Sequence, residues 1–372
     1  MTEKTHKPRI AVLFGGRSSE HAVSCVTAVG VMGAIDRQKY DVVPVGISKN
    51  GQWVLAGQET ERWQITADSL PEVDPAAQAV ALHSNGAGTE LVSSAPGEIP
   101  QLLGEVDVVF PLLHGPFGED GTVQGLLELA DIRYVGSGVL ASAVGMDKEY
   151  MKIIFSSAGL RVYPYQVIRE NEWRRSRSAV LARVEELGWP VFVKPARAGS
   201  SMGISKVDGP EQLEAAIEFA REYDPKVIVE AAVSGREVEC AVLQGRDGAP
   251  TRTSFPGEVV TSGDHSFYDF EAKYVAGSGT SLSCPAELPD AAIKEIRRAA
   301  AKAFEAIDAE GLSRVDFFYT PEGEVVINEI NTLPGFTPRS MYPQMWAASG
   351  MSYPELVEEL IQLALSRKTG LR

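Results

Sequence analysis

The sequence predicts an α/β beginning and an α+β remainder. Residues 10–14 and 107–113 are buried-type strands, and each runs into a glycine-rich turn and a helix-like pattern. This repeated strand, turn and helix unit is typical of a doubly wound parallel sheet. The pattern restarts after Val162-Tyr-Pro164, which indicates a domain boundary near residue 155, and the later half mixes strands and helices with a long hairpin.

Composition and charge exclude several classes of protein. The chain has 372 residues, 44% of them hydrophobic, and a formal net charge of -15. This acidic balance argues against a nucleic-acid or anionic-membrane partner, because both need a basic surface. The three cysteines, Cys25, Cys240 and Cys284, have no metal-binding or redox spacing, which fits a reducing compartment. Since the start carries no apolar leader, we expect a soluble cytoplasmic protein.

Two loops at strand ends are the first places where a ligand could bind. Gly15-Gly-Arg-Ser-Ser-Glu20 presents backbone N–H groups to an anion, but it lacks the G-x-G-x-x-G pattern of dinucleotide enzymes. An oxidoreductase is therefore a weak alternative. His114-Gly-Pro-Phe-Gly-Glu-Asp-Gly121 follows a buried strand, where open α/β sheets bind ligands, and a purely structural loop is an equal alternative.

The middle of the chain contains a second possible anion site. Residues 58–100 are rich in Ala, Pro, Ser, Gly and Glu, which predicts a surface excursion with little function. Residues 142–155 predict one helix that carries Met146-Asp-Lys148. A strand at 189–193 then ends at Lys194, and the small residues of 196–203 let backbone approach phosphates. A mobile loop without a ligand is the alternative.

Residues 263–277 predict a lid over a site. The segment has no clean period, carries aromatic residues and Lys273, and is bracketed by glycines. Such a loop can close, exclude water and deliver its lysine late, whereas the alternative is an irregular surface loop.

A hairpin with strands at 313–319 and 325–331 carries the strongest prediction. If Glu322-Gly323 is a two-residue loop, Asp316 lies opposite Glu329 and Arg314 opposite Asn331. The Cβ atoms of the two acidic residues are then about 5 Å apart, and such a pair shares a proton or holds a cation. Two carboxylates and an amide oxygen suit Mg²⁺ bound with phosphates. A solvated face of an edge hairpin is the alternative.

Seven short motifs follow one another along the chain: Gly15-Gly-Arg-Ser-Ser-Glu-His-Ala-Val-Ser24, His114-Gly-Pro-Phe-Gly-Glu-Asp-Gly121, Met146-Asp-Lys148, Val193-Lys-Pro-Ala-Arg-Ala-Gly-Ser-Ser201, Tyr268-Asp-Phe-Glu-Ala-Lys-Tyr274, Arg314-Val-Asp316 and Asn328-Glu-Ile-Asn-Thr-Leu-Pro-Gly335. Together and in this order they resemble the D-alanine:D-alanine ligases of the ATP-grasp superfamily over nearly the whole chain. The resemblance implies an N-terminal α/β substrate domain (1–155) and an ATP-grasp fold of two α+β lobes (156–236 and 237–372).

The resemblance also implies a nucleotide site and a metal site. Matching lysines contact the ATP phosphates, matching acidic and apolar residues hold adenine and ribose, and a serine-rich loop closes over the phosphates. These residues are Lys148, Lys194 and Lys273 for the phosphates, Glu230, Val233 and Glu237 for the adenosine part, and Ser200, Ser201 and Met202 for the loop. Asp316, Glu329 and Asn331 match the metal ligands, in agreement with the hairpin geometry.

Further matches imply the substrate contacts. Glu20 matches the residue that receives the ammonium of the first D-alanine, assisted by Ser200 and Tyr274. Ser340 matches the residue that binds the carboxylate of the second D-alanine, and His114 matches a residue that contacts the substrate. Arg314 and the Gly335 N–H match the donors to the oxyanion, and Lys273 matches a catalytic residue as well as a nucleotide-binding one.

The implied activity is ATP-dependent ligation of two D-alanines to D-alanyl-D-alanine through an acyl phosphate, which supplies peptidoglycan synthesis. The implied cofactors are ATP and Mg²⁺, with Mn²⁺ as a substitute, and the implied assembly is a homodimer. One alternative is a ligase for D-alanyl-D-lactate or D-alanyl-D-serine, against which Tyr274 argues. Another is an ATP-binding regulator without catalysis, against which the intact set of Arg314, Asp316, Glu329 and Asn331 argues.

Overall fold

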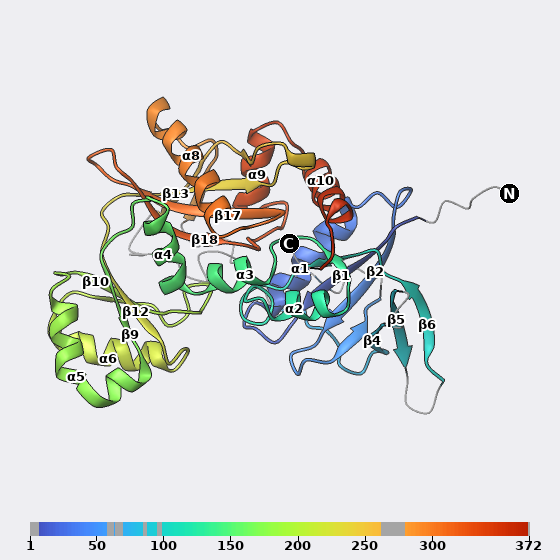
Figure 1. Cartoon of the computed structure of the whole chain (residues 1–372), viewed down its shortest axis with the longest axis horizontal. Helices are drawn as coiled ribbons and strands as arrows, with labels where there is room; N and C mark the ends of the chain where they lie inside the picture. The colour runs from blue at the N-terminus through green and yellow to red at the C-terminus, as the bar shows by residue number, and fades with distance from the viewer. Residues whose placement is uncertain are drawn as a thin grey trace.

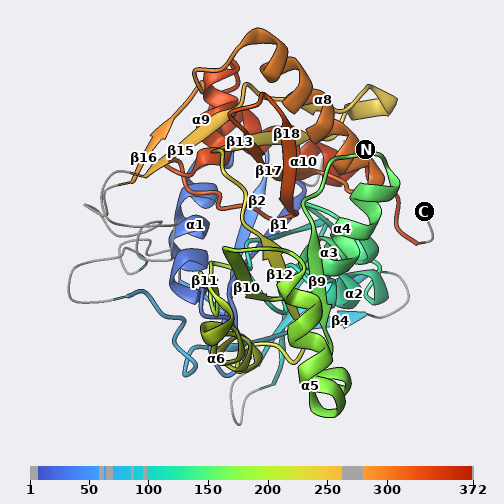
Figure 2. The same ribbon diagram turned by 90° about the vertical axis from the view of Figure 1, so that its left-hand side faces the viewer.

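The strands among the described residues form three sheets. The computed structural model describes residues 7–57, 63, 70–84, 88–94, 99–261 and 280–370. The sheets lie at the right, lower left and top of Figure 1, and the side view again places the second sheet below the third (Figure 2). Among the described residues, no helix combines the length and apolar character needed to cross a bilayer.

The centre of the first sheet is parallel and consists of β1 (Arg9–Gly15), β2 (Asp41–Ile47), β7 (Val108–Pro111) and β8 (Arg133–Tyr134). The helices in this part of the chain are α1 (His21–Ala34), α2 (Thr122–Leu129) and α3 (Val139–Met146). The strand order β2-β1-β7-β8 is parallel throughout. Ile10 and Phe14 of β1 share one core with α1, whereas Leu13 shares the opposite core with α2. The predicted doubly wound beginning is therefore confirmed.

The segment predicted as a surface excursion, residues 58–100, contributes to this sheet. The segment contains β4 (Ala79–Ser84) and β5 (Thr89–Ser94), which continue the sheet beyond β2 in antiparallel order together with the flanking strands β3 (Trp53–Leu55) and β6 (Gln101–Glu105). Val80 and Leu91 are buried in the core that includes Leu13. The sequence prediction was wrong here because serine, alanine and glycine residues masked a period of two in β4 and β5.

The second sheet is antiparallel and is built, with its helices, from β9 (Tyr165–Ile168), α5 (Glu170–Glu185), β10 (Val191–Pro195), β11 (Ser205–Val207), α6 (Pro210–Arg221) and β12 (Val227–Ala231). The strand order is β11-β10-β12-β9. Trp173 of α5, Ile217 of α6 and Val193 of β10 share its core. Both helices therefore bury their apolar sides on this sheet, as the helical spacing of apolar residues in α6 predicts.

The helix predicted at 142–155 is two helices. α3 ends at Met146, and α4 (Lys148–Ser157) begins at Lys148. Asp147 between them has extended backbone, and its carboxylate accepts hydrogen bonds from the N–H groups of Glu149 and Tyr150. An aspartate in that position caps a new helix, so the continuous-helix prediction was wrong and Lys148 starts α4.

The third sheet has the order β16-β15-β13-β17-β18, with a short additional strand beside β13. Its elements are β13 (Arg236–Leu243), the short 3₁₀ helix η2 (Arg246–Gly248), β14 (Arg252–Thr253), β15 (Gly257–Thr261), β16 (Thr280–Ser283), α8 (Asp290–Ala306), β17 (Leu312–Tyr319) and β18 (Val325–Asn331). Phe304 of α8 and Phe155 of α4 share the core of this sheet with Val315 and Ile327. The helix α4 thus belongs to the third sheet by its packing.

The last two helices, α9 (Met341–Ala348) and α10 (Tyr353–Ser366), carry the chain back to the first sheet. Leu360 of α10 shares one core with Ile10 of β1 and Met345 of α9. The C-terminal helices therefore bridge the first and third sheets. The predicted domain bounds at residues 155 and 236 stay a prediction.

The hairpin of β17 and β18 has the predicted pairing where the site was expected. Asp316 lies opposite Glu329, and Arg314 lies opposite Asn331. All four residues line one cavity, so the alternation of polar and apolar side chains predicted their common face correctly.

The predicted two-residue turn of this hairpin is wrong. Tyr319 pairs with Val325, and the N–H of Gly323 donates to the carbonyl of Thr320 (2.9 Å), so the turn is one residue longer. Gly323 has a φ of 84°, which such a turn needs at this position. A register shift after Asp316 offsets the extra residue, and the pairs beyond it keep the predicted register.

Candidate functional site

A cavity of 1590 Å³ is lined by residues of the second and third sheets and by loops and a helix that follow strands of the first sheet. Most predicted site residues line it, namely Glu20, His114, Lys148, Lys194, Ser200, Ser201, Glu230, Val233, Glu237, Arg314, Asp316, Glu329, Asn331, Gly335 and Ser340. Met202 does not line it, and Lys273 and Tyr274 lie outside the described residues. Since pockets for one small molecule usually measure ~300–1,000 Å³, this cavity has room for more than one substrate.

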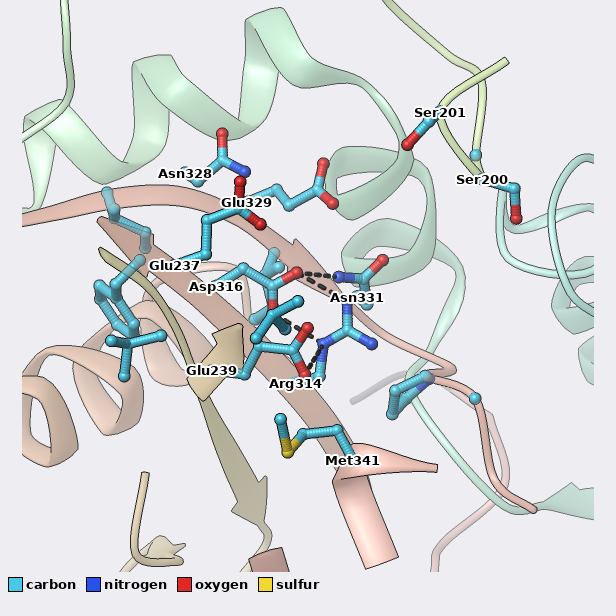
Figure 3. Close-up of a pocket in the computed structure, with 18 of the residues that line it drawn as sticks. Ser200, Ser201, Glu237, Glu239, Arg314, Asp316, Asn328, Glu329, Asn331 and Met341 are labelled. Atoms are coloured by element: carbon cyan, nitrogen blue, oxygen red, sulfur yellow. Dashed lines mark hydrogen bonds and ion pairs between the residues drawn. The ribbon is translucent and has the colours of Figure 1, made fainter. Parts of the chain in front are cut away.

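Three carboxylates lie in a row across adjacent strands of the third sheet. Glu239 of β13 pairs with Asp316 of β17, and Asp316 pairs on its other side with Glu329 of β18. Figure 3 shows Glu239 and Asp316 reaching toward the guanidinium of Arg314. Sequence reasoning missed Glu239, although Glu237 and Glu239 alternate with apolar residues along β13 and could have indicated a polar face.

Arg314 neutralises part of this row. Its Nε and Nη2 atoms donate to the two oxygens of Asp316 at 2.7 Å each, and its Nε lies 3.1 Å from Glu239 Oε2. Asn331 Nδ2 donates to Asp316 Oδ2 at 3.1 Å. Burial opposes the charge on Arg314, but the attraction of Asp316 and Glu239 outweighs it and raises the pKa of Arg314 well above its ordinary value. The guanidinium therefore stays charged.

A second buried ionic group links the second sheet to α4. The carboxylate of Glu230 lies 2.7 Å from the ammonium of Lys152 and 2.5 Å from that of Lys194. Burial tends to raise the pKa of Glu230, but the two lysines lower it far below its ordinary value. Lys152 was missed by sequence reasoning, although it lies one helical turn beyond Lys148 and therefore on the same face of α4.

Lys148 lies between the serine-rich loop and the hairpin. Its backbone N–H donates to the carbonyl of Ala196 (3.0 Å), and its ammonium donates to the carbonyl of Ala198 (3.1 Å). The same ammonium is 3.6 Å from Glu329 Oε2. Because two of these contacts are to the start of the loop, α4 and the loop hold Lys148 in one place.

The serine-rich loop is strained at two positions. Ser200 and Ser201 have φ angles of 49° and 59°, in the left-handed region that residues with a side chain rarely adopt. The N–H of Met202 donates to the carbonyl of Gly199 (3.1 Å), which closes the turn. Strain of this kind persists where surrounding structure imposes it, and it is frequent at ligand-binding loops.

Glu20 lies at the other end of the cavity, where the first glycine loop meets the serine-rich loop. Its carboxylate accepts a hydrogen bond from the Ser200 hydroxyl. A Cβ atom at Gly115 would lie 2.6 Å from Glu20 Oε2, and Gly115 has a φ of 76°. Glycine is thus required at 115 by the backbone and by the approach of Glu20.

His114 and Glu119 stand beside Glu20; the His114 side chain is 4% exposed and that of Glu119 is 15% exposed. The carbonyl of Leu333 accepts a hydrogen bond from His114 Nδ1 (3.2 Å), and the N–H of Gly115 donates to Glu119 Oε2 (3.1 Å). Burial lowers the pKa of His114, whereas burial together with the charge of Glu20 raises the pKa of Glu119 well above its ordinary value. Glu119 was singled out by the sequence only as one acid of its loop.

Two further edges of the cavity complete the predicted set. Gly335 follows β18, and Ser340 is the N-cap residue of α9, where its hydroxyl accepts a hydrogen bond from the N–H of Thr337 (3.1 Å). Val233, in the connection from β12 to β13, and Glu237 of β13 also line the cavity.

The row of acids provides ligands that suit a hard cation. Among the described residues, no group of three or more His, Cys, Asp and Glu side chains is arranged for a metal. Asp316 and Glu329 are nevertheless directly opposite, and Asn331 adds an amide beside Asp316. Two carboxylates with an amide are oxygen ligands of the kind that Mg²⁺ takes together with phosphates, so these residues fit that ion.

Comparison with known proteins gives consistent matches along the chain. Residues 9–137 match the family model described as "D-ala D-ala ligase N-terminus", and residues 154–362 match "D-ala D-ala ligase C-terminus". The D-alanine--D-alanine ligase of Arthrobacter sp. (strain FB24) is 66% identical over 98% of this chain and 96% of its own length. That of Streptomyces coelicolor is 56% identical over 98% of this chain and 95% of its own length.

Solved structures with these folds are also similar. The VanG D-Ala:D-Ser ligase from Enterococcus faecalis superposes with a TM-score of 0.82 and 38% identity, covering 96% of this chain and all of its own. The D-alanine-D-alanine ligase from Coxiella burnetii has a TM-score of 0.80 and 33% identity, covering 97% of this chain and 94% of its own.

The largely buried Glu119 makes stability depend on pH. Because its pKa is raised, the folded protein keeps a proton that the unfolded chain loses above about pH 4, and stability falls as pH rises through that window. Glu119→Gln removes this titration, so we expect the variant to gain stability relative to the wild type as pH rises. Urea denaturation at several pH values measures the gain, with the exposed Glu185→Gln as control. A difference independent of pH would contradict the expectation.

Proposed function

This chain belongs to the D-alanine–D-alanine ligase family, and on that premise we propose that it joins two D-alanine molecules while ATP is cleaved to ADP and phosphate. The observation that carries the proposal is the meeting, in one cavity, of cations suited to phosphates with a carboxylate and hydroxyls suited to amino acids. The product, D-alanyl-D-alanine, would supply peptidoglycan synthesis.

ATP would lie between the second and third sheets. Lys148 and Lys194 would bind its phosphates, with Ser200, Ser201 and Met202 as the closing loop and Lys273 as an additional cation. Val233 and Glu237 line the cavity; Val233 would contact adenine, and Glu237 would accept from the ribose hydroxyls. The carboxylate of Glu230 is paired with Lys152 and Lys194. We propose that it accepts a hydrogen bond from the adenine amino group while these lysines keep it in position.

The first step would form an acyl phosphate. Glu20, supported by Ser200 and Tyr274, would hold the ammonium of the first D-alanine, which leaves its carboxylate directed at the γ-phosphate of ATP. A carboxylate oxygen attacks phosphorus and ADP leaves. Lys148 and Lys194 would neutralise charge on the transferring oxygens.

The second step would form the peptide bond. Ser340 would bind the carboxylate of the second D-alanine, and His114 would contact the substrate side. The amine loses a proton and attacks the acyl carbon. Arg314 and the Gly335 N–H would donate to the oxyanion before phosphate leaves, and Arg314 is already charged and fixed by Asp316.

Asp316, Glu329 and Asn331 would hold Mg²⁺, or Mn²⁺ in its place. The bound ion would supply charge neutralisation at the phosphates of ATP. Lys148, Lys194 and Arg314, which also line the cavity, would neutralise further charge on the phosphates.

Location and assembly extend the proposal. The three cysteines are unpaired, which agrees with a reducing cytoplasm where ATP is available. We propose a homodimer, supported by the exposed apolar side chains of Leu126, Leu129, Val139 and Leu140 on α2 and α3.

Acceptor choice is the main alternative, because a similar solved structure is titled as a D-Ala:D-Ser ligase. The decisive experiment supplies ATP, Mg²⁺ and D-alanine alone or with an equal concentration of D-serine or D-lactate. We expect ADP, phosphate and D-alanyl-D-alanine in equal amounts, with the mixed products below a tenth of the total. Release of ADP without any dipeptide would overturn the proposal, and a dominant mixed product would favour the alternative.

The acidic row gives a second prediction. Glu329→Gln removes one charge from the proposed metal site while keeping the size of the side chain. We expect turnover to fall by about a hundredfold or more, as loss of one electrostatic catalytic group commonly does, and melting temperature to change little. The rate measured against Mg²⁺ and Mn²⁺ concentration is the test. Near-normal turnover at ordinary Mg²⁺ would refute the assignment.

A third prediction concerns a residue outside the cavity. The ammonium of Lys226 contacts the carboxylates of Asp147 and Glu149 at the start of α4, which begins at Lys148. Lys226→Met should let that helix start shift, so we expect the KM for ATP to rise about tenfold with that for D-alanine unchanged. The exposed Lys206→Met is the matched control. Equal rises in both constants would contradict this role.

A further inference from the structure

The excursion between β3 and β4 is anchored at the base of the first glycine loop. Trp63 packs its edge against Phe14, with ring centroids 5.1 Å apart and planes at 85°. Val73 packs against the backbone of Gly15 and Gly46. A Cβ atom added to Gly15 would lie 2.8 Å from Cγ2 of Val73, and one added to Gly46 would lie 2.7 Å from Cγ1 of Val73. Two described residues of the excursion thus pack where β1 ends and the loop to Glu20 begins.

His21 connects the two segments by hydrogen bonds. Its ring is 1% exposed. The N–H of Val73 donates to Nε2 (3.0 Å), so that nitrogen carries no proton, and Nδ1 donates to the carbonyl of Gly16 (2.7 Å). Burial lowers the pKa of His21, in agreement with a neutral ring. The two bonds require one tautomer and one ring orientation.

This arrangement bears directly on Glu20. Glu20 is the residue before His21, so a bond that fixes the His21 ring also fixes the end of the loop that presents the Glu20 carboxylate. The excursion also reaches the cavity itself, since Leu70 lines it together with Glu20 and is 65% exposed. Leu70 and Val73 are only three residues apart. The hydrogen bond that holds Val73 therefore also restricts the position of Leu70.

We propose that residues 70–73 act as a strap that holds the Glu20 loop through His21 and forms an apolar wall of the substrate end of the cavity. His21 is then a positioning residue for D-alanine binding, and Leu70 a specificity residue that favours small apolar side chains. This inference rests on the proposed function. The ordinary explanation, a core histidine that only stabilises the fold, makes different predictions.

Two substitutions of His21 separate its two bonds. The amide of Asn reaches about as far as Nδ1, so His21→Asn keeps a donor for Gly16 and loses the acceptor for Val73. The amide of Gln reaches about as far as Nε2, so His21→Gln keeps an acceptor for Val73 and loses the donor for Gly16. We expect His21→Asn to raise the KM for D-alanine about tenfold and His21→Gln to raise it less than threefold, with the KM for ATP unchanged in both.

Amide hydrogen exchange tests the same bond without turnover. The amide of Val73 should exchange at least tenfold faster in His21→Asn than in the wild type and in His21→Gln, because only that variant removes its acceptor. Thr89→Val is the control, since it removes another hydrogen bond of the excursion, the partly buried one from Thr89 Oγ1 to the carbonyl of Ala130, away from the cavity. Its KM values should equal those of the wild type.

Leu70→Ala is the second arm, and it does not depend on folding of the His21 variants. We expect an approximately threefold rise in the KM for D-alanine, a gain in the use of D-serine, and an unchanged melting temperature. Equal KM values in the two His21 variants, or an unchanged KM for both D-alanine and D-serine in Leu70→Ala, would overturn the strap. Absence of dipeptide from the wild type would instead overturn the proposed function, and the exchange result at Val73 would still decide the bond.

Discussion

The guanidinium of Arg314 allows three carboxylates on adjacent strands to lie side by side. Glu239, Asp316 and Glu329 occupy directly opposite positions on β13, β17 and β18, where like charges repel. Arg314 binds Asp316 through two nitrogens and also contacts Glu239, and Lys148 lies near Glu329. The sheet can therefore keep an acidic face in a cavity without a bound cation. An acidic face is also what the proposed divalent ion would require, so one charge arrangement would serve both stability and chemistry.

The sequence predicted this hairpin well because a period of two is a local property. Alternation along β17 and β18 was enough to bring Asp316 opposite Glu329, even though the turn is longer than predicted. The bulge after Asp316 could not be predicted, since it depends on how β18 packs against its neighbours. The break of the predicted helix at Asp147 had a readable signal, an aspartate before Glu149, but apolar periodicity on both sides concealed it.

Residues that act through tertiary contacts were missed for a different reason. Glu239 and Lys152 belong to no motif, and Glu119 stands in a motif in which sequence reasoning assigned it no role of its own; only the tertiary fold brings the three side chains to one cavity. The excursion shows the same limit. Its composition predicts a surface loop, yet His21 and Val73, 52 residues apart, form a buried hydrogen bond that no local pattern reveals.

The buried lysines show how such a cavity can exist before its substrate binds. A lysine without a partner in this position would lose its proton or admit water. Glu230 instead accepts from both Lys152 and Lys194, and Glu329 lies near Lys148. Phosphate oxygens are acceptors of the same kind as carboxylate oxygens, so the proposed binding of a nucleotide would exchange one anionic partner of these lysines for another. Lys152 is the most buried of the three, with 4% of its side chain exposed, so it would keep Glu230 in place when Lys194 contacts the phosphates as proposed. The cost of burying these charges is therefore borne by the fold, and the substrate meets cations that are already oriented.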